Sequence, residues 1–351
     1  MSPTHQAPST RSKQVLVLLT VLFAALVLGG ISAYSEVRAP DLANTLTPEA
    51  LPLTPPTEEL ERESERILAR AMEDSADLAR VLADHVDARA EYRAVTDRPV
   101  QGERYVTLEP GHSLQALRYR WSLTTRQLEE LNPELDWDNL EPGTEILVYR
   151  PTDEPTISRL RPNRGNLLNA ELMPEGDGWV LRRPFLSFGA TQTIDAIIDS
   201  VREVELHHPG GQDLMVADIS RREGGRFSPH RSHQSGRDVD LTYYRTEKGP
   251  ARFTTTRPRE LDAARTWTLI RTMLLQHDVV YIFMDRQLQI ALYEHAESIG
   301  EHPAFLSDIF QYGPRRHHNN SAPIRVAPGH RDHFHVRFGC SENDVRCGHA
   351  R

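Results

Sequence analysis

Cysteine is scarce in this chain. The 351 residues contain two, Cys340 and Cys347, both close to the C-terminus. A zinc site built on thiolates would need further cysteines nearby, and the sequence offers none. In an oxidising compartment, two cysteines separated only by the polar stretch SENDVR are expected to form a local disulfide, whereas in a reducing one they would be unrelated free thiols.

Positive charge is also in deficit, because 41 lysine and arginine residues stand against 50 aspartate and glutamate residues, for a net charge of −9. Proteins that bind nucleic acid usually carry a basic face for the phosphate backbone. The acidic balance therefore argues against a nucleic-acid partner, although it says nothing about the fold.

The N-terminus contains an uncharged apolar run, Val15 to Ile31, directly after Arg11 and Lys13. Such a run is a signal peptide or a membrane-spanning helix, and the basic flank keeps the N-terminus in the cytoplasm. No sharp cleavage site follows, so we favour an uncleaved anchor within residues 1–35 over a cleaved signal. In both cases the body is exported, and we expect a periplasmic protein tethered to the inner membrane.

Residues 36–100 are expected to separate the anchor from the folded domains. Five prolines between Glu36 and Pro56 predict an extended spacer. From Thr57 to Ala94 proline and glycine are absent and apolar residues recur at helical spacing, which predicts a helical stalk. The stalk is either a solvated helix or a coiled coil that would make the protein a homodimer.

Residues 104–150 have the pattern of a small βααβ unit. A short strand from Tyr105 to Leu108 precedes a turn, Ser113 is placed to cap a first helix, and a second helix starts at Thr124. A closing strand is expected from Glu145 to Tyr149.

This segment resembles a LysM domain. The resemblance lies in the LEELN stretch at Leu128 to Asn132 and in the run from Leu140 to Val148. The opening departs from the family pattern, since Val106 and Leu108 fill the usual Tyr and Val places and His112 stands where Asp is usual. The resemblance implies binding to glycan strands that contain N-acetylglucosamine; the alternative is a structural domain without sugar binding.

Residues 166–351 form the expected catalytic domain, after a polar connector over residues 151–162. Helical and strand-like stretches are mixed along it, which predicts an α+β domain with a small central antiparallel sheet and flanking helices. The expected helices are Gln192–Val204, Arg259–His277 and Gln287–Ala296, and the expected strands are Asp213–Ile219, Val239–Tyr243, Val279–Met284 and His333–Phe338.

Two clusters, GGRFSPHRSHQSGRDVDLTYY and GHRDHFHVRFGC, carry the residues suited to chemistry. Side chains two apart on a strand point to the same face, so His333 and His335 project together while the residues between them pack behind. Asp238 and Asp240 alternate with apolar residues in the same way. Two such strands, with imidazoles on one and carboxylates on the other, are expected to build a shared metal site. Zinc in a hydrolase takes three nitrogen or oxygen ligands and leaves one position for water, which suits two imidazoles and a carboxylate.

Together these clusters resemble the penicillin-insensitive murein endopeptidases, over about Arg183 to Cys347. The shared pattern is GGRF…H-x-SHQ-x-G-x-DVD followed by H-x-x-H-x-HVR and a cysteine pair. That family belongs to a wider group of lysostaphin-type, D-Ala-D-Ala and hedgehog-like zinc folds. The resemblance implies Zn²⁺ as the cofactor, bound by His233, Asp240 and His335.

Further roles follow from the same resemblance. His333 would be the base or transition-state stabiliser, His330 another active-site histidine, and His230 a metal-associated residue; no second metal site can be assigned. Independently of the resemblance, Arg226 or Arg337 suits a substrate carboxylate, because guanidinium pairs with it in a bidentate fork, although each is equally suited to a surface ion pair. Asp238 is expected to orient a ligand histidine or to be structural.

The function that the resemblance implies is hydrolysis of the D-alanyl–meso-diaminopimelate cross-link of peptidoglycan. Two alternatives remain at this point. A D,D-carboxypeptidase of the same fold would trim uncross-linked stem peptides, and a catalytically silent scaffold would use the fold for binding alone.

Overall fold

The computed structural model describes residues 99, 101–314 and 318–348. The chain divides into two units, residues 1–85 and 86–351, and every described residue belongs to the second. The expected membrane anchor, proline-rich spacer and helical stalk therefore lie outside the described residues. Within the described part, no helix combines the length and the apolar character needed to cross a membrane.

A six-stranded sheet organises the catalytic part of the unit, with the strand order β11-β10-β12-β9-β8-β6. The four inner strands pair antiparallel, which confirms the expectation for them. Both edge strands pair in parallel, and here the expectation of an antiparallel sheet was wrong. The reason is that helices connect each edge strand to its neighbour, as parallel pairing requires. The strands are β6 Trp179–Leu181, β8 Leu214–Asp218, β9 Asp238–Leu241, β10 Val279–Met284, β11 Ile324–Val326 and β12 Phe334–Phe338.

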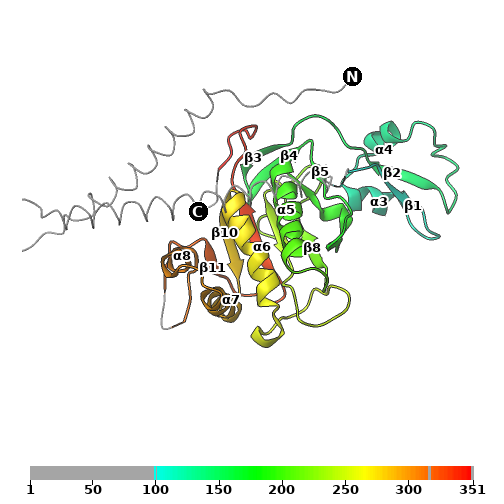
Figure 1. Ribbon diagram of the computed structural model, residues 1–351. Coiled ribbons are helices and arrows are strands. Elements are labelled where there is room, and N and C mark those ends of the chain that lie inside the picture. Colours follow the sequence, from blue (N-terminus) through cyan, green and yellow to red (C-terminus); the bar gives the residue numbers. More distant parts are fainter. Residues whose placement is uncertain (1–98, 100, 315–317, 349–351) are drawn as a thin grey trace, which may run out of the picture. The chain divides into compact units, whose positions relative to one another are not determined.

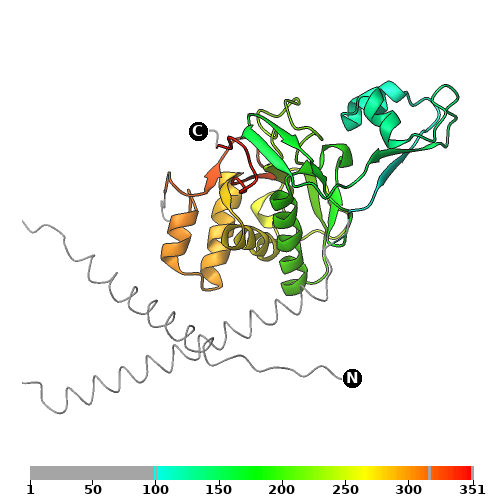
Figure 2. The same ribbon diagram turned by 90° about the horizontal axis from the view of Figure 1, so that it is seen from above.

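Helices α5 (Thr191–His207) and α6 (Ala263–Gln276) lie side by side along the sheet, as Figures 1 and 2 show. Their buried residues form one hydrophobic core with Val239 of β9 and Val336 of β12. The strand residues that alternate with these two point to the other face of the sheet. That second face is where the polar side chains of β9 and β12 lie.

The three predicted helices are confirmed, with shifted ends. The side chain of Asp262 accepts a hydrogen bond from the Arg265 backbone, so α6 starts at the next residue rather than at Arg259. Residues 258–260 form a separate 3₁₀ turn. A further short helix, α8, had not been predicted. The helices of this part are α5 Thr191–His207, α6 Ala263–Gln276, α7 Arg286–Ser298 and α8 Pro303–Ile309.

The predicted βααβ unit is present. Its resemblance to LysM domains stays a prediction. It consists of β1 Arg104–Thr107, α3 Leu114–Trp121, α4 Thr125–Leu131 and β2 Glu145–Tyr149. Side-chain caps set the helix starts: Ser113 accepts from the Ala116 backbone, and Thr124 forms a reciprocal capping box with Gln127. Trp121 of this unit meets Phe185 and Phe188 edge-on. The core of the unit therefore includes residues of the catalytic part, but it is a cluster separate from the core beneath α5 and α6.

The segment expected to be a polar connector contains a strand, so that prediction was wrong over its second half. β3 (Ile157–Arg161) pairs antiparallel with β4 (Arg164–Leu168). The sequence of β3, ISRLR, lacks an apolar alternation because its last three residues are exposed. Two-residue strands β5 (Glu171–Leu172) and β7 (Phe188–Gly189) form another small pair.

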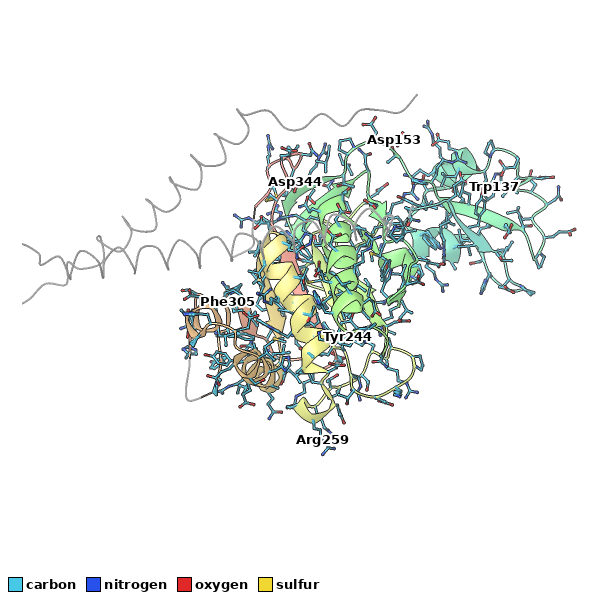
Figure 3. The ribbon with its side chains drawn as sticks, in the orientation of Figure 1. Trp137, Asp153, Tyr244, Arg259, Phe305 and Asp344 are labelled. Carbon is cyan, nitrogen blue, oxygen red and sulfur yellow. A yellow bond between two sulfur atoms is a disulfide. The ribbon has the colours of Figure 1, made fainter. Side chains whose placement is uncertain are left out.

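The C-terminal segment packs against the hairpin formed by β3 and β4. Asp344, labelled in Figure 3, accepts a hydrogen bond from the Ser158 backbone at 2.7 Å. Cys340 and Cys347 form a disulfide with sulfurs 2.07 Å apart, which confirms the predicted pairing. The buried guanidinium of Arg237 donates to the Gly348 carbonyl at 2.8 Å and holds the end of the loop.

Candidate metal centre

Two inner strands bring one histidine and one aspartate directly opposite each other. In the ladder between β12 and β9, His335 is the partner of Asp240, and Arg337 is the partner of Asp238. Facing side chains on antiparallel strands are close enough to bond. His335 Nδ1 lies 2.9 Å from Asp240 Oδ1, and both residues are buried.

A third side chain, that of His233, arrives from the loop between β8 and β9. Its ring Nδ1 donates to the Ile219 carbonyl at 2.9 Å, so Nε2 is the ring nitrogen available to bind an ion. Its backbone N–H donates to Asp238 at 2.8 Å. These bonds hold a residue whose φ is +64°, a left-handed conformation that costs a non-glycine residue about 1–2 kcal/mol. Such strain persists only where the surroundings fix it, and it is common at functional sites.

The three expected ligand atoms converge on one point. His233 Nε2 lies 3.1 Å from His335 Nδ1 and 3.2 Å from Asp240 Oδ1, and the third distance is 2.9 Å. Ligands about 2.0–2.1 Å from a tetrahedral zinc ion would be ~3.3–3.4 Å apart. Small outward shifts therefore accommodate an ion, and the donor set of two imidazoles and a carboxylate fits zinc.

An outer layer of contacts orients these expected ligands. The Asp238 carboxylate faces His335 Nε2 at 3.5 Å and pairs with Arg337 through two bonds of 2.6 and 2.9 Å. A carboxylate behind a ligand histidine fixes its ring orientation in many metal sites. This is the orienting position expected for Asp238. Arg337, in contrast, is buried and its guanidinium is already bound to Asp238, so the geometry does not support its expected role in binding a substrate carboxylate.

The electrostatics of the ligands favour a cation. Burial alone would raise the pKa of Asp240, but His233 and His335 outweigh it and hold this pKa well below its usual range. Burial alone would lower the pKa of His335, but Asp238 and Asp240 outweigh it and raise this pKa to about 9. The anionic surroundings thus stabilise positive charge at the point where the ligand atoms meet.

His230 approaches the same carboxylate from the side. Its Nδ1 lies 3.6 Å from Asp240 Oδ2, and its Nε2 lies 2.8 Å from Asp218 Oδ2. Asp218 also pairs with Arg183. Burial would raise the pKa of Asp218, but His230 and Arg183 keep it below its usual value. The position of His230 is compatible with its expected association with a metal.

His333 and His330 lie beside the expected ligands. His333 Nδ1 lies 2.7 Å from Asp332, and its Nε2 lies 3.8 Å from Asp240 Oδ1. The ring of His330 is 4.9 Å from that of His333. Burial, together with the nearby His333, lowers the pKa of His330, so its ring is predominantly neutral at pH 7. A neutral imidazole beside the expected ligands is suited to proton transfer.

The three expected ligands and the histidines around them line one cleft of about 780 Å³. The cleft thus brings together six of the predicted site residues with Arg337; Arg226, the other predicted arginine, is not among the residues that line it. The lining residues are Arg182, Arg183, Asp218, Pro229, His230, Arg231, Ser232, His233, Asp240, Phe253, Phe283, Ala327, Pro328, His330, His333, His335 and Arg337.

Sequence reasoning missed several of these residues. Asp218 ends β8 and is the ladder partner of Asp240, so its place at the end of a strand of apolar character was an available signal. Asp332, which contacts His333 from outside the cleft lining, could also have been predicted, because it directly precedes that histidine in the sequence. Arg182 and Phe253 carry no pattern that marks them, because only the fold brings them to the cleft.

Comparison with known proteins agrees with this geometry. No curated protein matches the chain. The model of one protein family, penicillin-insensitive murein endopeptidase, matches residues 161–351, which is more than half of the chain and includes every residue of the cleft. The chain therefore belongs to the penicillin-insensitive murein endopeptidase family, the members of which are peptidoglycan hydrolases.

Proposed function

We propose that this chain is a zinc-dependent endopeptidase that hydrolyses the D-alanyl–meso-diaminopimelate cross-link of peptidoglycan. The observation that carries the proposal is the convergence of His233 Nε2, Asp240 Oδ1 and His335 Nδ1 within 3.2 Å of one another. Family membership supports peptidoglycan as the substrate and a periplasmic or cell-wall location.

In this proposal His233, Asp240 and His335 hold the ion, and His230 is placed to join them or to orient a water molecule. A zinc ion bound there supplies a Lewis acid for the scissile carbonyl and lowers the pKa of a coordinated water molecule. The Asp238–Arg337 pair keeps the ring of His335 in the orientation that presents Nδ1.

His333 is the residue best placed to move the proton. Asp332 holds its Nδ1, so that its Nε2 faces the ligands. From there it accepts a proton as water attacks the D-alanyl carbonyl, and it returns a proton to the amine when the carbon–nitrogen bond breaks. The Nδ1 of His330 donates to the Pro328 carbonyl, so its neutral ring presents Nε2 as an acceptor and can receive a hydrogen bond from the substrate.

The remainder of the chain would keep the enzyme at its substrate. The βααβ unit would bind N-acetylglucosamine-containing glycan strands as a LysM domain, and residues 15–31 would anchor the protein in the inner membrane. Tethering of this kind raises the local concentration of cross-links without any change at the cleft.

The test is digestion of defined muropeptides by the purified full chain loaded with zinc. Conversion of cross-linked dimers to monomers supports the endopeptidase. Removal of terminal D-alanine alone would instead identify a D,D-carboxypeptidase, and no change in either substrate would identify a binding scaffold. Addition of a chelator should stop the digestion, and replenished zinc should restore it.

A further inference from the structure

Two adjacent arginines at the end of β6 have different surroundings in the cleft. Arg183 pairs with Asp218, which also holds His230. Arg182 makes no ion pair within the described part of the chain, and its side chain is exposed. Its backbone is nevertheless fixed, because its N–H donates to the Val216 carbonyl at 2.9 Å. A guanidinium on a fixed backbone is thus presented to the cleft without a protein carboxylate.

The Arg182 guanidinium rests on an aromatic ring. Its central carbon lies 4.0 Å from the centroid of the Phe253 ring, within the range of a cation–π contact. Phe253 in turn stacks on His333, with centroids 5.2 Å apart and planes inclined by 23°. One ring therefore separates the unpaired guanidinium from the histidine that faces the metal ligands.

The loop that carries Phe253 is held at both ends. On one side, the buried side chain of Gln212 donates to the Pro250 carbonyl at 2.8 Å. On the other, the Thr256 N–H donates to the carbonyl of Arg331 at 2.8 Å. Arg331 lies between His330 and His333, so the loop is joined to the segment that carries the proton-transfer histidines. The ring has a defined position from which to orient Arg182.

A guanidinium held by its face presents its N–H groups edge-on, in the geometry that binds a carboxylate through two bonds. The proposed substrate has such a group close to the scissile bond, because the diaminopimelate carbon that bears the scissile nitrogen also bears a carboxylate. Arg337 is engaged with Asp238 and Arg183 with Asp218, so neither competes for it.

We propose that Arg182, supported by Phe253, binds the diaminopimelate carboxylate beside the scissile amide and makes the enzyme select cross-links in which this carboxylate is free over those in which it is amidated. This inference rests on the proposed endopeptidase function. Arg182 is thus a specificity-determining residue and Phe253 a positioning residue.

The experiment compares two synthetic cross-linked dimers that differ only in this group, one a free carboxylate and one a carboxamide. Binding is measured by calorimetry on the full chain after removal of metal, which prevents cleavage. The wild type should bind the free-carboxylate dimer about 10- to 100-fold more tightly, as expected for hydrogen bonds to a charged group. Arg182→Gln should bind both dimers with equal affinity.

Arg231→Gln is the matched control, since Arg231 lines the same cleft without an aromatic support or an ion pair within the described residues. It should keep the preference. Phe253→Ala should reduce the preference and Phe253→Tyr should restore it. With zinc-loaded protein, Arg182→Gln should raise KM for the free-carboxylate dimer by the same factor and leave kcat nearly unchanged.

The outcomes separate the two proposals. Equal affinity of the wild type for both dimers, absence of binding to either, or a preference that survives Arg182→Gln would overturn the carboxylate site even if the enzyme cuts cross-links. A preference lost in Arg182→Gln would support it even if the zinc-loaded protein cut neither dimer, in which case the endopeptidase function would fail alone.

Discussion

The candidate metal centre is built from two kinds of structure, a pair of strands and a loop. Asp240 and His335 are ladder partners on β9 and β12, so the backbone hydrogen bonds of the sheet set their separation. His233 comes from a loop, where a left-handed backbone and bonds to Ile219 and Asp238 set its position. The strand pair provides a rigid base, and the loop completes the site at the cost of local strain.

The largest effects on zinc binding and activity are expected at the three ligands, and they should be equal if the loop and the strands serve one ion. His233→Ala from the loop and His335→Ala or Asp240→Ala from the strands should each lose the bound zinc. Each should also lose more than about 100-fold in activity, because loss of a residue that only orients a ligand already costs up to about 100-fold. Zinc content by mass spectrometry and muropeptide digestion check this. His207→Ala, an exposed histidine at the end of α5, is the control. Retention of zinc by one class of variant would break the comparison.

A second loop residue should behave differently, because His333 faces the ligands without being one of them. His333→Ala should keep its zinc while kcat falls by about 10²–10⁴-fold, the usual contribution of a general acid or base. Parallel measurement of zinc content and turnover separates the two roles. Loss of zinc in this variant would place His333 among the ligands.

The support behind the strand pair can be tested next. Asp238→Ala should weaken zinc binding about 10- to 100-fold. It should also lower the free energy of unfolding of the zinc-free protein by about 3–5 kcal/mol, because Arg337 is left buried without its partner. Urea unfolding and competitive zinc titration measure the two effects.

The double variant Asp238→Leu/Arg337→Met is the matched control, since it removes both charges. It should recover most of the stability while zinc binding stays weak. A single Asp238→Ala variant as stable as the wild type would show that the ion pair does not support the strands.

The smallest effect on chemistry is expected at the C-terminal disulfide. Cys340→Ser with Cys347→Ser opens a loop of sequence separation 7 and should lower the free energy of unfolding by about 2–3 kcal/mol. Activity at 25 °C should not change, since neither cysteine lines the cleft. Thermal unfolding and digestion assays check this, and a large loss of activity would show that the loop contributes to the site.

The same contrast explains what the sequence could predict. Alternation of polar and apolar residues was sufficient to place Asp240 and His335 on one face, because strand periodicity is regular. No periodicity describes a loop, so His230 and His233 were recognised only through the family motif. The short edge strands β6 and β11 lack enough residues for a pattern, and Phe253 reaches His333 only through tertiary contacts. Long-range neighbours of this kind are decided by the fold.

Anomalous diffraction at the zinc edge from crystals of the zinc-loaded full chain tests the central claim most directly. The account predicts one strong peak about 2.0–2.2 Å from His233 Nε2, His335 Nδ1 and Asp240 Oδ1. A peak located elsewhere in the protein, or an ion bound by only one of the two strand residues, would contradict it.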